Sequence, residues 1–304
     1  MNTDYRSGYV SVVGRPNTGK STLINALLGQ KVAAVSPKAQ TTRRRQLGIL
    51  TTDEFQVVFV DTPGIHNPRH KLGEFLNQEA QEALEGVDVV LFLVDASLEP
   101  TDEDQWIAPR LGRLSHRTPL VLACNKIDLI PAEALTGRLE AYQALVPPGT
   151  QVVPISAANG AGLETLQAAL LAHIPPGKPQ YGTEQVTDLY EREIAAELIR
   201  EACLFKLRDE VPHGVAVRID EFTERGDEGA YIAATIFVER ESQKGIVIGR
   251  GAEMLKQIGS EARAQIEDMS GRKVFLELRV KVLKEWRKDE KAMKRFGYRL
   301  KKRR

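Results

Sequence analysis

The fold of the first half of the chain is decided by the stretch Gly14-Arg15-Pro16-Asn17-Thr18-Gly19-Lys20-Ser21-Thr22. An apolar run expected to form a strand, Tyr9–Val13, precedes it, and the apolar residues of Leu23–Leu28 follow at helical spacing. A strand, a glycine-rich loop ending in Lys-Ser and a helix are typical of a phosphate-binding loop, because backbone N–H groups and the helix N-terminus face phosphate oxygens there. Lys20 would reach the β- and γ-phosphates of a nucleotide, and Ser21 would hold Mg²⁺.

A second motif follows the predicted strand Gln56–Val60 and reads Asp61-Thr62-Pro63-Gly64-Ile65. Asp61 at the end of a strand can bind Mg²⁺ or its water shell, and the N–H of Gly64 can contact the γ-phosphate. Some small GTPases carry at the position of Ile65 a glutamine that orients the attacking water. A hydrophobic side chain cannot do so, and we therefore expect slow intrinsic hydrolysis that depends on another group.

A third motif follows the predicted strand Pro119–Cys124 and reads Asn125-Lys126-Ile127-Asp128. The carboxylate of Asp128 can accept two hydrogen bonds from the N1–H and N2–H₂ groups of guanine, a donor pair that adenine lacks. Sites that recognise polar groups in this way discriminate by roughly 10⁴–10⁵. Asn125 would brace the loops and meet the base N7, and Lys126 would cover the base with its aliphatic stem. The motif therefore predicts specificity for GTP.

The fourth motif is Ser156-Ala157-Ala158, after the predicted strand Val152–Ile155, and its backbone N–H groups would contact guanine O6. A further apolar strand is expected at Asp88–Val94. Short apolar strands separated by helices predict an α/β fold of the P-loop NTPase class, a mostly parallel sheet with helices on both faces. Four motifs, each at the C-terminal end of a strand, meet at one edge of such a sheet.

A nucleotide-sensing threonine is expected between the first helix and the second strand, in Lys38-Ala39-Gln40-Thr41-Thr42-Arg43-Arg44-Arg45. A GTPase needs a mobile threonine here to cap Mg²⁺ and to sense the γ-phosphate. Thr41 and Thr42 are both candidates, and we favour Thr41 as the third magnesium residue beside Ser21 and Asp61.

The second half of the chain has a different pattern of elements. A run of proline and glycine, Pro175–Pro179, marks the boundary. The expected order is helix, strand, strand, helix, helix, strand, at 188–205, 215–219, 231–238, 242–248, 252–269 and 274–282, with a turn at 225–229 between the first two strands. This order indicates a separate α+β domain.

Composition and charge narrow the class of protein further. The chain has 304 residues and two cysteines without metal spacing, Cys124 and Cys203, which fits small core residues in a reducing cytosol. No stretch approaches the roughly 18–20 apolar residues of a membrane span. The net charge of +1 combines +8 in residues 284–304 (eleven Lys/Arg, three Asp/Glu) with 1 − 8 = −7 elsewhere. A basic end of this kind suggests an anionic partner.

Across nearly its whole length, Tyr5 to Tyr298, the chain resembles the Era family of bacterial ribosome-assembly GTPases. The matching stretches are 14–21, 40–43, 61–64, 125–128, 238–244, 247–249 and 276–282. The resemblance implies a GTP-binding domain at 1–175, a linker at 176–188, a type II KH domain at 189–285 and a basic tail at 286–304. It also implies a K⁺ ion held by Asn17 and by the backbone near Thr41, which would accelerate hydrolysis.

KH domains clamp about four nucleotides of single-stranded RNA with a GXXG loop between two helices. Here the loop reads Gly249-Arg250-Gly251-Ala252, with alanine at the fourth position. By resemblance the RNA-binding residues are Ile248, Gly249, Arg250, Gly251, Ala252 and Lys256. The ligand implied is the 3′ end of 16S ribosomal RNA, bound by a monomeric cytoplasmic GTPase that acts as a switch in assembly of the 30S subunit.

The alternative hypothesis belongs to another class of function. In it the chain is a GTP-gated protein- or membrane-interaction module with a degenerate KH domain, and the basic tail touches anionic lipid on the inner face of the cell membrane. Ala252 and the charge of the tail favour it. Trp286, Met293, Phe296 and Leu300 are scattered among charges, however, without the sustained apolar face that a membrane-surface helix needs.

Overall fold

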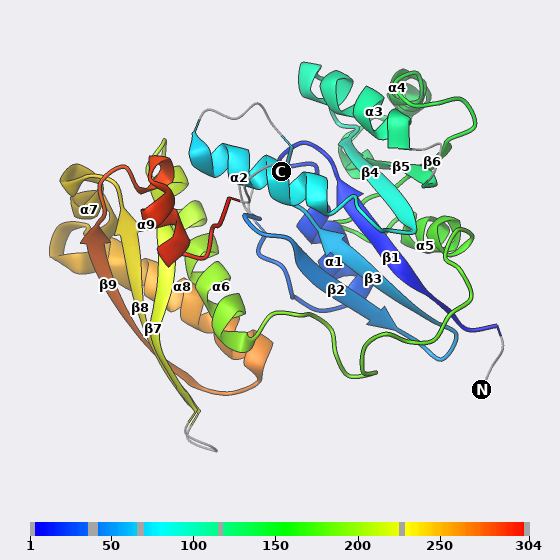
Figure 1. Cartoon of the computed structure of the whole chain (residues 1–304). Helices are drawn as coiled ribbons and strands as arrows, with labels where there is room; N and C mark the ends of the chain where they lie inside the picture. Colours follow the sequence, from blue (N-terminus) through cyan, green and yellow to red (C-terminus); the bar gives the residue numbers. More distant parts are fainter. Residues whose placement is uncertain (1–3, 36–41, 66–69, 115–117, 225–228, 301–304) are drawn as a thin grey trace. The chain divides into compact units, whose positions relative to one another are not determined.

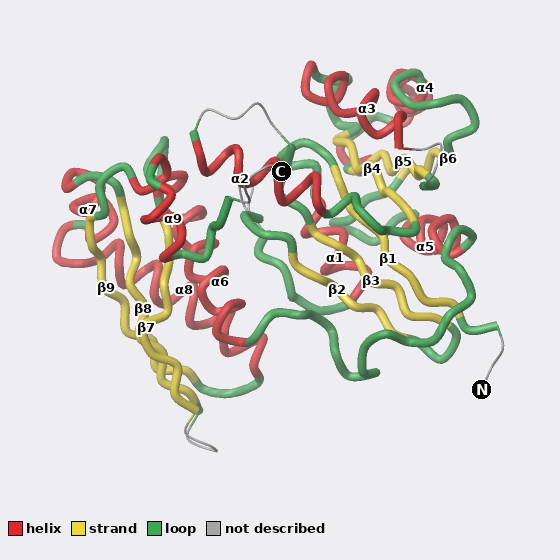
Figure 2. Tube along the Cα trace, in the orientation of Figure 1, coloured by secondary structure: helices red, strands yellow, loops and turns green. Residues whose placement is uncertain are grey.

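The computed structural model describes residues 4–35, 42–65, 70–114, 118–224 and 229–300. The chain divides into two compact units. The first unit comprises residues 1–33, 42–67 and 76–188, and the second comprises 34–41, 68–75 and 189–304. Figure 1 gives the course of the chain through each unit, and Figure 2 shows which segments are helix, strand or loop.

A six-stranded sheet forms the centre of the first unit, in the order β2-β3-β1-β4-β5-β6. All neighbouring strands are parallel except β2 and β3. The strands are β1 (Arg6–Val13), β2 (Gln46–Thr51), β3 (Phe55–Asp61), β4 (Val89–Asp95), β5 (Leu120–Asn125) and β6 (Gln151–Pro154). The predicted class, a mostly parallel α/β sheet, is confirmed.

Helices cover both faces of this sheet. They are α1 (Lys20–Leu28), α3 (Asp102–Leu114), α4 (Ala132–Gln143) and α5 (Leu163–Leu171). The helix α2 (Lys71–Glu82) begins in residues that belong to the second unit and ends in residues that belong to the first. Alternate residues of β4 pack into two separate cores, one on each face of the sheet. Leu91 packs in the core that includes residues of α1 and α5, and Phe92 packs in the core that includes residues of α3 and α4. Burial on both faces explains why this strand reads as one continuous apolar run.

The sequence patterns do not predict β2. Its third residue, Gly48, lowers the strand propensity of the segment. A Cβ atom at Gly48 would lie 2.6 Å from Cγ2 of Ile24. Gly48 therefore weakens the sequence signal for β2 and, because it has no Cβ atom, allows α1 to approach that strand.

The second unit has the predicted order of helices and strands, α-β-β-α-α-β, followed by one helix that was not predicted, α9. Its elements are α6 (Glu191–Lys206), β7 (Ala216–Glu224), β8 (Ala230–Val238), α7 (Glu241–Ile248), α8 (Glu253–Ser270), β9 (Val274–Val282) and α9 (Glu290–Arg295). The sheet order is β7-β8-β9, antiparallel and then parallel. Leu198 of α6 and Ile258 of α8 are buried in one core with Ile232 of β8. Most of the turn expected at 225–229 lies outside the described residues.

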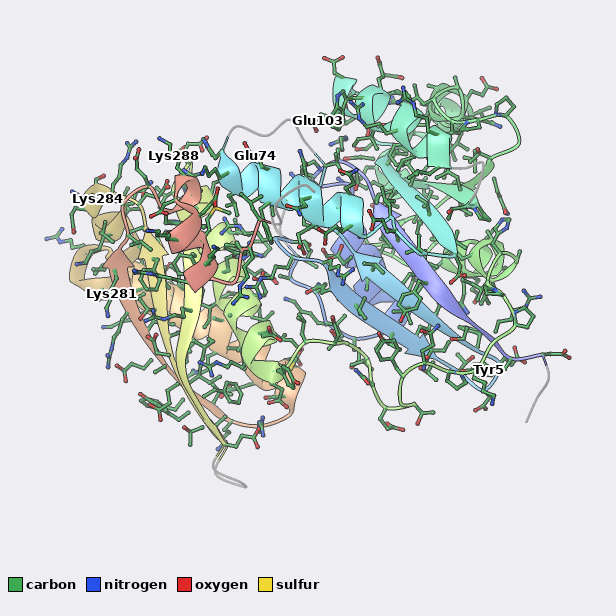
Figure 3. All side chains as sticks on the ribbon, in the orientation of Figure 1. Tyr5, Glu74, Glu103, Lys281, Lys284 and Lys288 are labelled. Carbon is green, nitrogen blue, oxygen red and sulfur yellow. The ribbon has the colours of Figure 1, made fainter. Side chains whose placement is uncertain are left out.

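The segment after β9 is an integral part of the second unit. The side chain of Trp286 is fully buried, and its Nε1 donates a hydrogen bond to the carbonyl of Gly214 over 2.8 Å. The ring of Phe296 contacts both Trp286 and Phe237, each at a centroid distance of 5.1 Å. Within the described part of the expected tail, residues 286–300, the side chains of Trp286, Met293, Phe296 and Tyr298 are buried. Lys288, labelled in Figure 3, is exposed, whereas Arg287 forms an ion pair with Glu239.

Both cysteines are core residues. Cys124 and Cys203 are buried, and burial raises the pKa of each thiol to about 12. At neutral pH both thiols are protonated and shielded from solvent. Within the described ranges, no helix combines the length and apolar character needed to cross a membrane.

Candidate functional site

The phosphate-binding loop connects β1 to α1 and is tightly packed. A Cβ atom at Gly14 would lie 2.2 Å from the carbonyl oxygen of Leu93. Gly19 has a φ of 98°, and a Cβ atom there would lie 2.4 Å from Nδ2 of Asn125. Only glycine fits these two positions, so the loop can wind closely in front of the first turn of α1.

Lys20 lies at the start of α1 with its ammonium group inside the loop. Its Nζ donates hydrogen bonds to the carbonyls of Gly14 (3.2 Å) and Arg15 (2.9 Å). Burial lowers the pKa of Lys20 to about 8, although the nearby Asp61 carboxylate opposes this shift. A buried ammonium held mainly by carbonyls is under-compensated, and a phosphate anion in the loop would restore its charge balance.

Asp61, the last residue of β3, gathers polar side chains at the end of this loop. Its Oδ2 accepts hydrogen bonds from Ser21 Oγ (2.8 Å), Thr42 Oγ1 (3.0 Å) and Gln46 Nε2 (3.4 Å). The hydroxyls of Ser21 and Thr42 lie 2.9 Å apart. Burial raises the pKa of Asp61 above its ordinary value.

The donor set around Asp61 fits Mg²⁺. Its Oδ1 is buried and has no hydrogen-bond partner in the described part of the chain. Hydroxyl and carboxylate oxygens are the ligands that Mg²⁺ prefers. Thr41, the favoured third magnesium residue, lies outside the described residues. The described threonine that reaches the cluster is Thr42.

The segment after Asp61 lies against the phosphate-binding loop. Thr62 Oγ1 donates to the carbonyl of Val12 over 2.8 Å, and the N–H of Ile65 donates to the carbonyl of Gly14 over 3.3 Å. A Cβ atom at Gly64 would lie 2.6 Å from the backbone nitrogen of Pro16. Pro63 lies between Thr62 and Gly64, so the whole motif follows the loop closely.

Asn125 joins the loops that follow three different strands. Its Nδ2 donates to the carbonyl of Thr18 over 2.7 Å, and its Oδ1 accepts from the N–H of Ala157 over 2.9 Å. The side chain of Asp128 is exposed in a short 3₁₀ turn after β5. Asp128 is therefore presented at the same edge of the sheet as the phosphate-binding loop.

Sequence reasoning missed a group of charged side chains beside these loops. Asp95, the last residue of β4, lies 2.6 Å from Lys126 Nζ and 3.6 Å from an Arg15 guanidinium nitrogen, while Arg15 Nε donates to Asp104 over 3.2 Å. Burial acts to raise the pKa of Asp95, but hydrogen bonds from Lys126 and Ser97 outweigh it and lower the pKa. The signal was available, since Asp95 also ends a parallel strand.

The GXXG-type loop of the second unit lies between α7 and α8. Gly249 has a φ of 73°, and a Cβ atom there would lie 2.8 Å from Cβ of Met254. Gly251 and Ala252 also have positive φ values, 60° and 63°. The side chain of Arg250 is exposed. The loop thus has a positive φ at three of its four positions, including the one occupied by alanine.

A groove of about 450 Å³ opens beside this loop, between α8 and β9. Its lining residues are Ala252, Leu255, Lys256, Gly259, Ser260, Arg263, Leu276, Glu277 and Leu278. The predicted Lys256 belongs to this groove, whereas Ile248 and Arg250 do not line it. Arg263 was missed, although it follows Lys256 by seven residues and so lies on the same face of α8.

Comparison with known proteins agrees with both units. Residues 9–126 match the family model of 50S ribosome-binding GTPases, and residues 210–287 match the KH domain model. The chain is 48% identical over 294 residues to GTPase Era of Geotalea uraniireducens (strain Rf4), which covers 97% of this chain and 98% of that protein.

Two solved structures are similar over the same length. A crystal structure of Era in complex with MgGDPNP and nucleotides 1506–1542 of 16S ribosomal RNA is 39% identical, with a TM-score of 0.89, covering 97% of this chain and 100% of that one. A crystal structure of a variant of Aquifex aeolicus Era bound to GDP·AlF₄⁻ is 40% identical, with a TM-score of 0.87 and the same coverage. A P-loop unit followed by a KH unit, with this identity over nearly the whole chain, shows that the protein belongs to the Era family of GTPases.

Proposed function

We propose that the first unit binds GTP with Mg²⁺ in the loop between β1 and α1. Residues 14–22 would surround the phosphates, with Lys20 on the β- and γ-phosphates. Ser21 and Asp61 would hold the metal, joined by Thr41 or Thr42, and Mg²⁺ supplies charge stabilisation to the phosphoryl group when bound. The buried Oδ1 of Asp61 supports this assignment. MgGDPNP bound to the 39% identical relative supports it too.

The guanine base would be recognised by Asp128, with Asn125 as the brace behind it and Lys126 covering the base. Within 156–158, the N–H of Ser156 donates to the carbonyl of Ala161, and that of Ala157 is held by Asn125. We therefore assign the contact to guanine O6 to the N–H of Ala158.

Hydrolysis would depend on a monovalent cation, because Ile65 cannot orient water. We propose K⁺ beside Asn17, whose side chain is exposed at a φ of 66°. Glycine tolerates that backbone conformation. Asn17→Gly therefore removes the amide while keeping the loop. The expected result is faster GTP turnover in K⁺ than in Na⁺ for the unchanged chain, with the difference lost in Asn17→Gly. Equal rates in both salts for the unchanged chain would contradict the proposal.

The second unit would bind single-stranded RNA at Ile248 and the loop 249–252. The observation that carries this proposal is the groove beside the loop, which Lys256 and Arg263 line. The relative with nucleotides 1506–1542 of 16S ribosomal RNA supports the same ligand for this chain. The proposed role is therefore a cytoplasmic, monomeric switch in assembly of the 30S subunit.

The test is the affinity of the full-length chain for an RNA with the sequence of the small-subunit rRNA 3′ end, measured over a series of salt concentrations. Lys256→Ala should weaken binding and reduce the salt slope by about one phosphate contact. Lys281→Ala is the matched control, because it removes the same charge from an exposed position outside the groove (Figure 3). Equal losses in both variants would indicate only nonspecific attraction to the basic surface.

The competing hypothesis of a membrane- or protein-interaction module has weak support. A basic segment that binds lipid needs exposed apolar residues to insert. Trp286, Met293 and Phe296 are instead buried in the second unit. Binding of the full-length chain to anionic vesicles, with no affinity for the rRNA segment, would nevertheless favour that class.

A further inference from the structure

The segment that precedes the second unit lies along the free edge of β2. The N–H of Ile49 donates to the carbonyl of Val186 over 2.9 Å, and the N–H of Leu47 donates to Oδ1 of Asp188 over 2.8 Å. Val186 also packs against the core of the first unit. Residues 186–188 are therefore fastened to β2 by one main-chain and one side-chain hydrogen bond.

The first residue of the same strand reaches the candidate magnesium site. Gln46 is buried, and its Nε2 donates to Oδ2 of Asp61 over 3.4 Å. Gln46 and Asp61 are also direct partners in the β2–β3 register. Two consecutive residues of β2 thus have different partners: Gln46 contacts the carboxylate of the site, and Leu47 contacts Asp188.

Very little chain separates this attachment from the second unit. Only Leu189 and Tyr190 lie between Asp188 and the first residue of α6. Tyr190 is itself tied to that helix, because its N–H donates to the carboxylate of Glu193 over 3.2 Å. A displacement of Leu47 that moves Asp188 would therefore reach the start of α6 through only two intervening residues.

Covering an exposed strand edge explains the bond to Val186, since unpaired edges promote association with other chains. It does not require a carboxylate at Asp188. We propose that Asp188 is a positioning residue that transmits the nucleotide state from Asp61, through Gln46 and Leu47, to the segment that begins the second unit. This inference rests on the proposed nucleotide binding at Asp61.

The physical basis is competition for one carboxylate oxygen. At 3.4 Å, the bond from Gln46 is the longest of the three that Oδ2 accepts. Oxygens that rearrange around a metal and a γ-phosphate would alter this bond together with those of Ser21 and Thr42, which share the same carboxylate oxygen. A ligand shifts such an arrangement only if it has different affinity for its two states. The relay therefore predicts two positions of Leu47, one for each nucleotide.

The test uses the full-length chain with GDP and with GDPNP. Amide hydrogen exchange is measured across residues 46–49 and 186–191, and RNA affinity is measured in parallel. Asp188→Ala removes the acceptor, Asp188→Asn keeps an oxygen in the same place, and Glu184→Ala changes an exposed linker carboxylate outside the pair. Thermal unfolding verifies that each variant is folded.

In the unchanged chain, exchange in both segments should differ between the two nucleotides. In Asp188→Ala, the amide hydrogen of Leu47 should exchange roughly twofold to tenfold faster than in the unchanged chain, as expected for loss of one hydrogen bond. The nucleotide-dependent difference at 186–191 should disappear. Asp188→Asn and Glu184→Ala should behave like the unchanged chain.

Identical exchange at 186–191 with GDP and GDPNP in the unchanged chain would overturn the relay, as would a nucleotide-dependent difference that survives in Asp188→Ala. Failure of the proposed function gives a different result. In that case RNA affinity is the same with both nucleotides although exchange differs, and the relay stands without its RNA output.

Discussion

The hydroxyl of Ser21 donates a hydrogen bond to Oδ2 of Asp61 over 2.8 Å, while Oδ1 of the same carboxylate is buried and has no hydrogen-bond partner in the described ranges. Leaving a buried acceptor unsatisfied typically costs about 1–3 kcal/mol. Such a cost is retained at sites where a ligand supplies the missing interaction. The pair therefore connects the first helix to the third strand at the point where a metal is expected.

Replacing that carboxylate tests the metal assignment. Asp61→Asn keeps the shape of the side chain but removes the charge that would hold Mg²⁺. GTP hydrolysis should fall by roughly 100-fold or more, because a bound metal contributes several kcal/mol of charge stabilisation. Steady-state phosphate release at saturating GTP measures the loss. Asp53→Asn, at an exposed position between β2 and β3, should leave the rate unchanged.

The pKa of Lys20 leads to a prediction about proton uptake. In the free protein burial lowers that pKa to about 8, so above pH 8 most molecules have a neutral Lys20. A bound diphosphate raises the pKa, and the complex therefore takes up a proton. At pH 8.5 the uptake should be roughly half a proton or more per GDP.

Calorimetry in two buffers of different ionisation enthalpy, with EDTA to exclude Mg²⁺, measures this uptake. Lys20→Arg is the control, because its guanidinium stays charged in both states. If the two proteins showed the same uptake, the proton would have to come from another group.

Asp128 should determine which base is accepted. Asp128→Asn replaces one carboxylate oxygen by an NH₂ group, which faces a donor of guanine but matches the C2 carbonyl of xanthine. Affinity for GDP should fall by roughly 10²-fold or more, while affinity for xanthosine diphosphate rises. Competition against a fluorescent nucleotide compares the two. Parallel losses for both bases would mean that Asp128 shapes the loop rather than recognising guanine.

Much of this arrangement could be predicted from sequence, because each motif carries its own local signal. The loop 14–22 needs glycines between a strand and a helix. In the second unit, alternation of apolar and polar residues predicted the strands, and apolar residues at helical spacing predicted the helices. Contacts that depend on distant segments gave no such signal. Arg15 meets Asp104, and Trp286 meets Gly214, only after folding. The basic residues around Trp286 indicated an exposed segment, so the burial of Trp286 was not predicted. In the same way, Gly48 weakened the signal for β2.

The alanine in the loop between α7 and α8 leads to two substitutions with opposite expected effects on stability. Ala252 has a φ of 63°, where a residue with a Cβ atom pays roughly 1 kcal/mol. Ala252→Gly should therefore stabilise the second unit by about 1 kcal/mol and should not weaken RNA binding. Ala264→Gly, at an exposed position inside α8, should destabilise it by about 1 kcal/mol. Urea unfolding of the second unit measures both, and the same sign for the two changes would contradict the strain.

We infer that one chain couples its guanine nucleotide to the binding of single-stranded RNA. The most direct measurement is the affinity of the full-length protein for the rRNA 3′-end segment with GDP and with GDPNP at one stated salt concentration, since affinities of this kind depend strongly on salt. We predict tighter binding with GDPNP, and Arg250→Ala should weaken binding in both states. Equal affinity with the two nucleotides would contradict the switch, and binding unaffected by Arg250→Ala would contradict the assigned RNA loop.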